Sequence, residues 1–247
     1  MNWIPLLWLA AALALLLLIE RWIHRHLQGV MLLLTGDPDI AVVLYALPLL
    51  PGIVIHELSH ALSALLLGVR VGRISIRPKR AGQRIQLGFV PVERTDAARA
   101  SLIGLAPLLT GCAAILLIGY RVFGLGAAGT ALPAGDWASL AGGMVGAADF
   151  WFWAYLIFAI GNTMLPSRAD RQAWPPVMLF LLLIGVSVWL VGLGPMVVES
   201  LAASLVAALR WLTLMCAITI AVDLPFVLLI ALAERLLGRI KGVRVEY

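Results

Sequence analysis

Residues 51–60 read PGIVIHELSH, and they place ionisable side chains where a membrane-spanning segment is expected. His56, Glu57 and His60 interrupt an apolar run over residues 40–67 that has no other charged residue. Placing a charged side chain at the centre of a membrane helix costs on the order of 2.5–3.5 kcal/mol even on insertion scales. Ionisable residues at such positions are functional candidates by default.

The composition is that of an integral membrane protein. Of 247 residues, 62% are hydrophobic and 13% are charged, and the mean hydropathy is +1.01. Soluble domains have about 45–50% apolar and about 25% charged residues, so this chain has too little polar surface to coat a water-soluble globule. We predict one all-α, polytopic domain over residues 1–247, with a core at about 40–175 and flanking helices at 1–20 and 176–237.

Uncharged runs locate the spans. The runs at 1–19, 101–120, 150–167 and 173–198 are near or above the ~18–20 residues that a spanning helix needs, as is 40–67. The first run lacks the basic start and small-residue cleavage site of a secretory signal, so we interpret it as a retained helix. The tail at 201–237 forms one or two helices, with a candidate break at Asp223-Leu224-Pro225. The prediction is about six transmembrane helices.

Basic residues set the orientation. Eight Lys and Arg lie between residues 68 and 101, which predicts a cytoplasmic loop and a cytoplasmic N-terminus. Arg21 and Arg25 disagree, because this orientation puts them in an outside loop together with His24 and His26. We predict a multi-pass protein of the cell membrane. The asymmetry accounts for the net charge of +5 and gives no indication of a nucleic-acid partner.

The basic loop predicts a β-hairpin. Residues 69–77 end in alternation of apolar and polar side chains, 85–89 alternate again, and 78–83 supply turn residues. We expect a cytoplasmic, membrane-associated hairpin directly after the HExxH helix. Its open edge is suited to binding an unwound peptide through main-chain hydrogen bonds, and its basic face to binding anionic lipid headgroups. Both interpretations stay open.

The HExxH spacing indicates a metal site. His56 and His60 are four residues apart, so on a helix they stand on one face and can hold one Zn²⁺. Glu57 is then placed to take a proton from a water molecule activated by the metal. Chance HExxH matches occur on wet helix surfaces, but inside an apolar helix each polar group needs a partner. The sequence therefore predicts one catalytic Zn²⁺ per chain, with its active site toward the cytoplasmic side.

A catalytic zinc site needs a third protein ligand. Asp170 follows the span at 150–167 and lies at the same membrane face as the HExxH helix end, which makes it the best candidate. The others are set aside as outside residues, residues near mid-membrane or core thiols: His24, His26, Asp149, Glu199, Asp223, Cys112 and Cys216.

These residues resemble the site-2 protease family of intramembrane zinc metallopeptidases. Asn162 lies eight residues before Asp170, as the family's Asn lies before its ligand Asp, and Ala106-Pro107 is similar to a turn that members carry. The resemblance implies a zinc endopeptidase that cuts transmembrane or membrane-adjacent proteins, with Asn162 supporting the site or the substrate. Two departures stand out. Arg171 replaces the usual Gly after the Asp, and Pro166 is one place later than usual.

Two other classes of function compete with a protease. A second membrane HExxH class needs Glu-x-x-x-Asp on a later helix, but Ala203 follows Glu199 and Gly238 follows Glu234 at that spacing. The alternative is a non-proteolytic membrane protein. It is either an inactive protease-like scaffold, for which Arg171 leaves room, or a transporter that handles metal or protons through the same His and Glu cluster. The sequence indicates the bilayer and a transmembrane protein substrate as partners, but no oligomeric state.

The orientation can be tested by cysteine labelling in intact cells. With Gly82→Cys the thiol should be protected from an impermeant external reagent, and with Gly126→Cys it should be labelled, because the two loops are predicted on opposite sides of the membrane. External labelling at residue 82 would reverse the predicted orientation.

Overall fold

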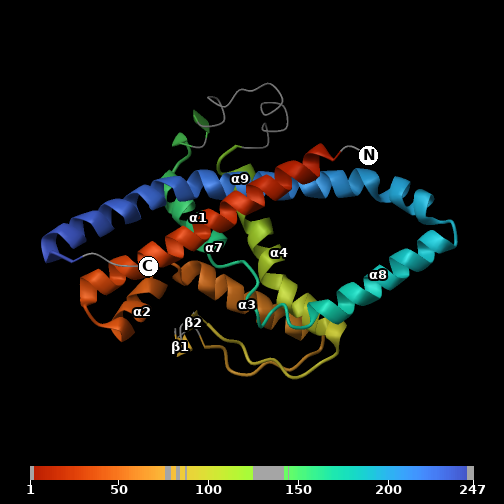
Figure 1. Cartoon of the computed structure of the whole chain (residues 1–247), viewed down its shortest axis with the longest axis horizontal. Helices are drawn as coiled ribbons and strands as arrows, with labels where there is room; N and C mark the ends of the chain where they lie inside the picture. Colours follow the sequence, from red (N-terminus) through yellow and green to blue (C-terminus); the bar gives the residue numbers. More distant parts are fainter. Residues whose placement is uncertain are drawn as a thin grey trace.

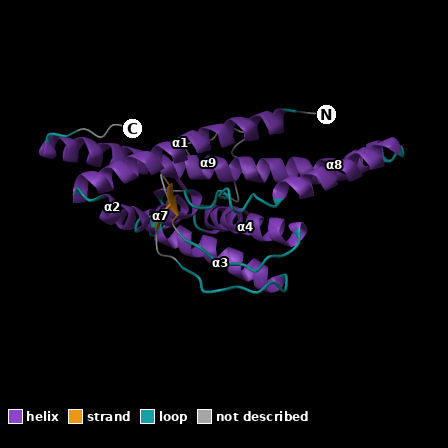
Figure 2. Ribbon diagram, turned by 60° about the horizontal axis from the view of Figure 1, so that its bottom comes forward, coloured by secondary structure: helices purple, strands orange, loops and turns teal. Residues whose placement is uncertain are grey.

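The computed structural model describes residues 3–75, 79–81, 84–86, 88–124, 142–143 and 145–243. This part of the chain is mainly helical (Figures 1 and 2). Its elements are α1 (Ile4–Thr35), α2 (Pro38–Ala46), α3 (Leu50–Leu66), β1 (Lys79–Ala81), β2 (Arg84–Gln86), α4 (Ala97–Arg121), α7 (Phe150–Gly161), α8 (Trp174–Leu190) and α9 (Gly194–Lys241).

Two long helices form one layer of the molecule. α1 and α9 run side by side in the same direction, with α2, α3, α4 and α7 on one side of them in Figure 2. Ile23, Leu27 and Val30 of α1 and Cys216 and Val222 of α9 belong to one buried apolar core. Cys112 lies in the same core, so the prediction that the two cysteines are core residues is confirmed. No residue of α8 is buried, and that helix extends away from the core in Figure 1.

The predicted span at 40–67 is two helices with a bend of 74° between them. The N-cap of α2 is Asp37, whose side chain accepts hydrogen bonds from the backbone N–H groups of Asp39 and Ile40. Pro48 lies at the bend, and Pro51 lies in the first turn of α3; proline lacks the N–H that a continuous helix would need there. The bent pair is a broken span or a re-entrant loop, and it positions the HExxH turn on α3.

The helices correct several predicted boundaries. α1 continues to Thr35, so the prediction of an outside loop containing His24 and His26 is wrong. α9 is continuous through Pro225, so no break occurs at Asp223. By length and composition three described helices could cross a membrane (α1, α4 and α9), or four if α2 and α3 form one span. The described chain is thus mainly helical with three or four candidate spans, while its insertion as a polytopic protein with six spans stays a prediction.

The loop before α4 contains an antiparallel strand pair. Lys79 pairs with Gln86 and Ala81 with Arg84, so residues 79–81 are strand where the sequence predicted a turn. Isolated bridges join Val71 to Val92 and Ser75 to Phe89, and they extend the antiparallel course back toward α3. The cytoplasmic location of this loop and its association with the membrane stay predictions.

Close packing of α3 on α7 depends on Gly52. A Cβ atom at this position would overlap the carbonyl oxygen of Ala159 and the hydroxyl of Thr163. Glycine allows helix backbones in membranes to approach closely, where van der Waals packing drives association. This contact lies one turn before His56 and brings α7, the helix that leads to Asp170, against the HExxH helix.

Replacing this glycine should destabilise the fold despite a better helix propensity. Gly→Ala in a helix is normally favourable by about 0.8–1.0 kcal/mol, but Gly52→Ala must push α7 away. We expect a lower midpoint of thermal unfolding in detergent. The matched control is Gly185→Ala in α8, where a Cβ meets nothing within 4 Å, and its midpoint should be unchanged or raised. Equal midpoints for the two variants would contradict the packing argument.

Candidate metal centre

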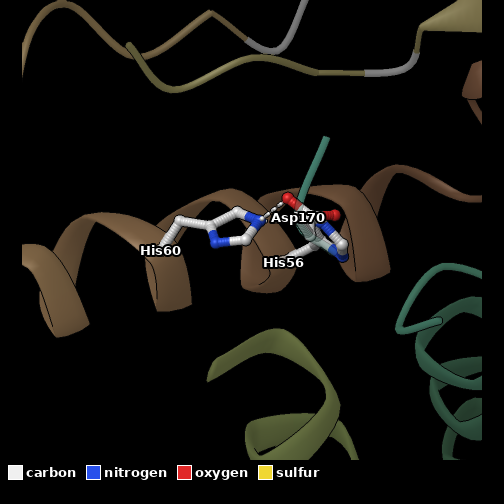
Figure 3. Close-up of side chains that lie close together, drawn as sticks. All are labelled: His56, His60 and Asp170. Atoms are coloured by element: carbon white, nitrogen blue, oxygen red, sulfur yellow. Dashed lines mark hydrogen bonds and ion pairs between the residues drawn. The ribbon is translucent and has the colours of Figure 1, made fainter. Parts of the chain in front are cut away.

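Three side chains from two distant segments converge on one point. The Nε2 atoms of His56 and His60 lie 3.2 Å apart on one face of α3 (Figure 3). The Asp170 carboxylate, from the segment between α7 and α8, lies with Oδ1 3.1 Å from His60 Nε2 and Oδ2 3.9 Å from His56 Nε2. One donor atom from each residue falls within 4.8 Å of the other two.

This donor set fits a divalent zinc ion. With bonds of about 2.0–2.2 Å to nitrogen and oxygen, tetrahedral zinc holds its ligand atoms about 3.3 Å apart. The two histidine nitrogens are 3.2 Å apart, and each lies 3.1–3.9 Å from one of the two Asp170 oxygens, which is close to that spacing. Two imidazoles and one carboxylate leave a fourth position open, as in catalytic zinc sites.

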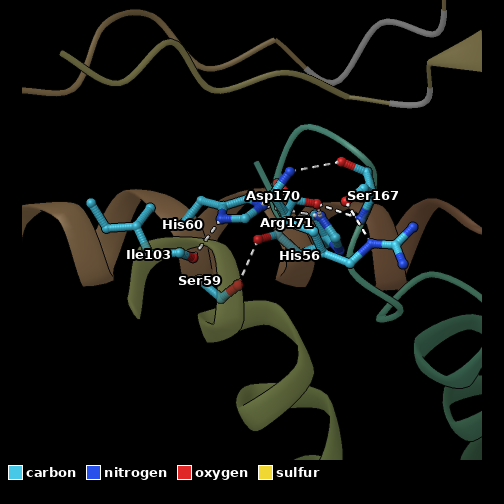
Figure 4. Close-up of polar contacts among 7 residues, drawn as sticks. All are labelled: His56, Ser59, His60, Ile103, Ser167, Asp170 and Arg171. Atoms are coloured by element: carbon cyan, nitrogen blue, oxygen red, sulfur yellow. Dashed lines mark hydrogen bonds and ion pairs between the residues drawn. The ribbon is translucent and has the colours of Figure 1, made fainter. Parts of the chain in front are cut away.

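A proline in α4 orients His60. Pro107 has no N–H, so the carbonyl of Ile103, four residues earlier, has no donor within its own helix. The Nδ1–H of His60 donates to this carbonyl instead, at 2.9 Å (Figure 4). That bond fixes the tautomer with the free electron pair on Nε2, which is the atom that faces Asp170. The Ala106-Pro107 pair, a weak signal in the sequence, thus contributes directly to the site.

Asp170 is held by the turn that contains it. The backbone N–H of Ser167 donates to Asp170 Oδ2 at 2.6 Å, and the N–H of Asp170 donates to Ser167 Oγ at 3.3 Å. Burial acts to raise the pKa of Asp170, but the hydrogen bonds from Ser167 and, when its ring is protonated on both nitrogens, from His60 outweigh it and lower the pKa to about 2. Asp170 is therefore an anion at neutral pH, the state in which a carboxylate binds a metal.

Arg171 does not disturb the cluster. Its exposed side chain turns back, and its Nε–H donates to the carbonyl of Ser167 at 3.3 Å (Figure 4). The residue that departs from the family pattern therefore reinforces the turn that holds Asp170.

A second glycine lets α4 approach this turn. A Cβ atom at Gly104 would overlap the carbonyl oxygen of Asp170. One turn of α4 therefore contacts both sides of the cluster, through Ile103 to His60 and through Gly104 to Asp170. The sequence analysis missed this role, since a glycine in an apolar helix has no distinctive pattern.

Glu57 lines the same cavity as the metal-binding candidates. The cavity has a volume of about 1270 Å³, and the Glu57 residue is only 6% exposed. The segment after β2 covers it so closely that a Cβ atom at Gly88 would overlap the Glu57 carboxylate. A buried carboxylate beside three candidate ligands, in a cavity large enough for a peptide segment, is the arrangement that water-activating hydrolases use.

Asn162 lies outside the ligand cluster. It is 2% exposed, and its Nδ2 donates to the carbonyl of Phe158 at 2.9 Å and to Asp223 Oδ1 of α9 at 3.1 Å. It also lines the cavity. Asp223, which the sequence analysis set aside as a ligand, is fully buried on α9.

Other predicted positions are not brought into the cluster. Among the described residues the donor group is His56, His60 and Asp170, without His24, His26, Asp149, Glu199 or either cysteine. However, His24 lines the cavity with Glu20, Gln28 and Tyr45, a wall that the sequence analysis did not predict. The spacing of four residues between Glu20, His24 and Gln28 was the signal available for it.

Comparison with known proteins gives one family. The model described as Peptidase M50B-like matches residues 40–125, which include α3, the strand pair and α4 but end before Asn162 and Asp170. No curated protein and no solved structure gives a significant match. The matched family model, whose range contains the HExxH helix, supports assigning this chain to the site-2 protease family, M50, as a membrane metallopeptidase-like protein.

Proposed function

We propose that this protein is an intramembrane zinc endopeptidase that hydrolyses peptide bonds of transmembrane or membrane-adjacent proteins. The observation that carries the proposal is the convergence of His56, His60 and Asp170 within 4.8 Å, in a cavity that Glu57 also lines. The M50B-like match supports it. The active site faces the cytoplasmic side of the cell membrane, as the basic loop before α4 predicts.

Each polar group of the cavity has a role in this proposal. The two imidazoles and the Asp170 carboxylate hold one Zn²⁺, which when bound acidifies a water molecule and polarises the scissile carbonyl. Glu57 accepts the proton of the attacking water and passes it to the leaving amine. The bond from His60 to the Ile103 carbonyl keeps His60 in the ligating tautomer.

The segment after β2 is suited to hold an extended substrate beside Glu57. Phe89 exchanges both backbone hydrogen bonds with Ser75, at 2.8 and 2.9 Å, so the backbone groups of the next residue point to the other edge. No hydrogen bond joins the backbone of Val90 to another backbone group of the described chain. A substrate segment that pairs with this edge must change from helix to extended strand. It would then lose its own helical hydrogen bonds, which exposes the scissile amide.

No contact or cavity of the described residues favours the non-proteolytic alternative over a protease. Arg171 left room for an inactive scaffold, but it bonds to Ser167 and leaves the cluster intact. A transporter that handles protons or metal has no need for a carboxylate at the HExxH position next to two candidate ligands.

The metal site predicts about one Zn²⁺ per purified chain. Asp170→Asn replaces an anionic ligand with a weaker neutral one, so zinc affinity should fall by more than the ~10–100-fold that outer-shell changes cost. His56→Ala/His60→Ala should abolish binding. Metal content is measured by mass spectrometry on protein in detergent.

Asp149→Asn is the matched control for the metal site. Asp149 has φ of 56°, a left-handed conformation that Asn tolerates, and it lies outside the cluster. Full zinc in the double-histidine variant would eliminate the site, and full zinc affinity with Asp170→Asn would eliminate Asp170 as a ligand.

Glu57→Gln separates the proton acceptor from the ligands. The change preserves shape and removes the carboxylate, so zinc content should stay at the wild-type level. Proton transfer by a positioned side chain contributes about 10²–10⁴-fold, and cleavage of transmembrane reporters in liposomes should fall by that factor. Undiminished cleavage would remove Glu57 from the mechanism.

A further inference from the structure

One wall of the cavity is a polar stripe on α1. Glu20, His24 and Gln28 are spaced four residues apart, line the cavity and are half-buried. The neighbouring Arg21 and Arg25 are exposed. The polar face of this helix therefore turns toward the protein and its basic residues turn away. Polar side chains on an otherwise apolar membrane helix face cavities or partners, and they mark functional paths.

His24 is fixed by two neighbours. Its Nδ1 is hydrogen-bonded to the hydroxyl of Tyr45 of α2, which is 3% exposed, and its Nε2 lies 3.6 Å from Glu20 Oε1. The second distance is longer than a normal hydrogen bond. Glu20 thus has a positioned neighbour but retains acceptor capacity on the side of the cavity.

The charges at this end of the cavity are not balanced within the described chain. The Glu20 side chain is 13% exposed. Among the described residues His24 is its ion-pair partner, and no Lys or Arg forms an ion pair with it. The fully buried Asp223 lies near enough for the charge of Glu20 to act on it, and its Oδ2 has no hydrogen-bond partner in the described chain. The arginines that line the cavity, Arg94 and Arg168, come from the segments before α4 and before Asp170.

We propose that Glu20, His24 and Gln28, supported by Tyr45, form a substrate-recognition subsite for a cationic side chain, Lys or Arg. The inference rests on the proposed function, because the same cavity contains Glu57 and the metal-binding candidates. A peptide held beside Glu57 would therefore present one of its side chains to the stripe. Glu20 supplies the countercharge, and Gln28 supplies a further hydrogen-bond acceptor.

A long basic side chain suits this site better than an acidic or short polar one. Lys and Arg combine an apolar stem with a cationic head, so the stem can lie along the apolar wall of the cavity while the head reaches the carboxylate. An acidic side chain would be repelled by Glu20. Removing one partner of a buried charge pair is strongly destabilising, so the site should reject uncharged isosteres clearly.

The test measures binding and cleavage with matched reporters. Transmembrane peptides with a photoreactive probe carry Lys or Met at one position, which is moved step by step along the segment. Binding is the cross-linking yield to full-length protein carrying Glu57→Gln, and cleavage is measured with the wild-type chain. We expect one position where Lys exceeds Met by at least about tenfold, the preference that a charge-assisted hydrogen bond supports.

Variants of α1 attribute the preference to Glu20. Glu20→Gln should abolish the preference for Lys and leave the Met reporter bound as before. Glu20→Lys should prefer a reporter with Glu at the same position. Arg21→Gln, on the exposed face of α1, is the matched control and should leave the preference unchanged.

The outcomes separate this subsite from the protease proposal. No preference at any position, or equal losses for Lys and Met reporters with Glu20→Gln, would overturn the subsite even if zinc and cleavage are intact. A preference for Lys that Glu20→Gln removes, with no cleavage of any reporter by the wild-type chain, would keep the subsite and reject the protease.

Discussion

The hydrogen bond from His60 to the carbonyl of Ile103 is the interaction on which the candidate site depends. It exists because Pro107 deprives that carbonyl of its own helical partner, and a buried carbonyl without a donor is costly. One bond therefore meets two needs. It satisfies the backbone of α4, and it directs Nε2 of His60 toward Asp170.

Close contact between backbones places Asp170, the candidate third ligand. Gly52 allows α7 to pack on α3, and Gly104 allows the turn containing Asp170 to rest on α4. In a membrane, where apolar side chains gain little by leaving lipid, such contacts and buried polar bonds are what fixes helices in one arrangement. The geometry of the cluster is thus a property of three helices, not of the HExxH segment alone.

Features that depend on short stretches of the chain could be predicted from the sequence. The spacing of His56 and His60 gave their shared face, and the position of Asp170 at a span end gave its approach to them. Charge counting predicts the end of a span at Glu20 and Arg21, but α1 continues to Thr35. The helix continues past these charges, and Glu20, His24 and Gln28 line the cavity. Their spacing of four residues indicates one polar face, but the cavity that this face lines depends on the packing of distant helices. The bend before α3 had its signal in Pro48 and Pro51, but its angle depends on packing against α1 and α7.

The long stretch of chain between the two halves of the cluster, which includes α4 and α7, has a consequence for biosynthesis. A chain is made from its N-terminus, so the HExxH helix enters the membrane before Asp170 is synthesised. Until α7 has docked on α3, the centre has two imidazoles and no carboxylate, a set short of the three protein ligands of catalytic zinc. It follows that the candidate metal centre is completed late in biosynthesis, only after the segment that contains Asp170 has been made and packed against α3.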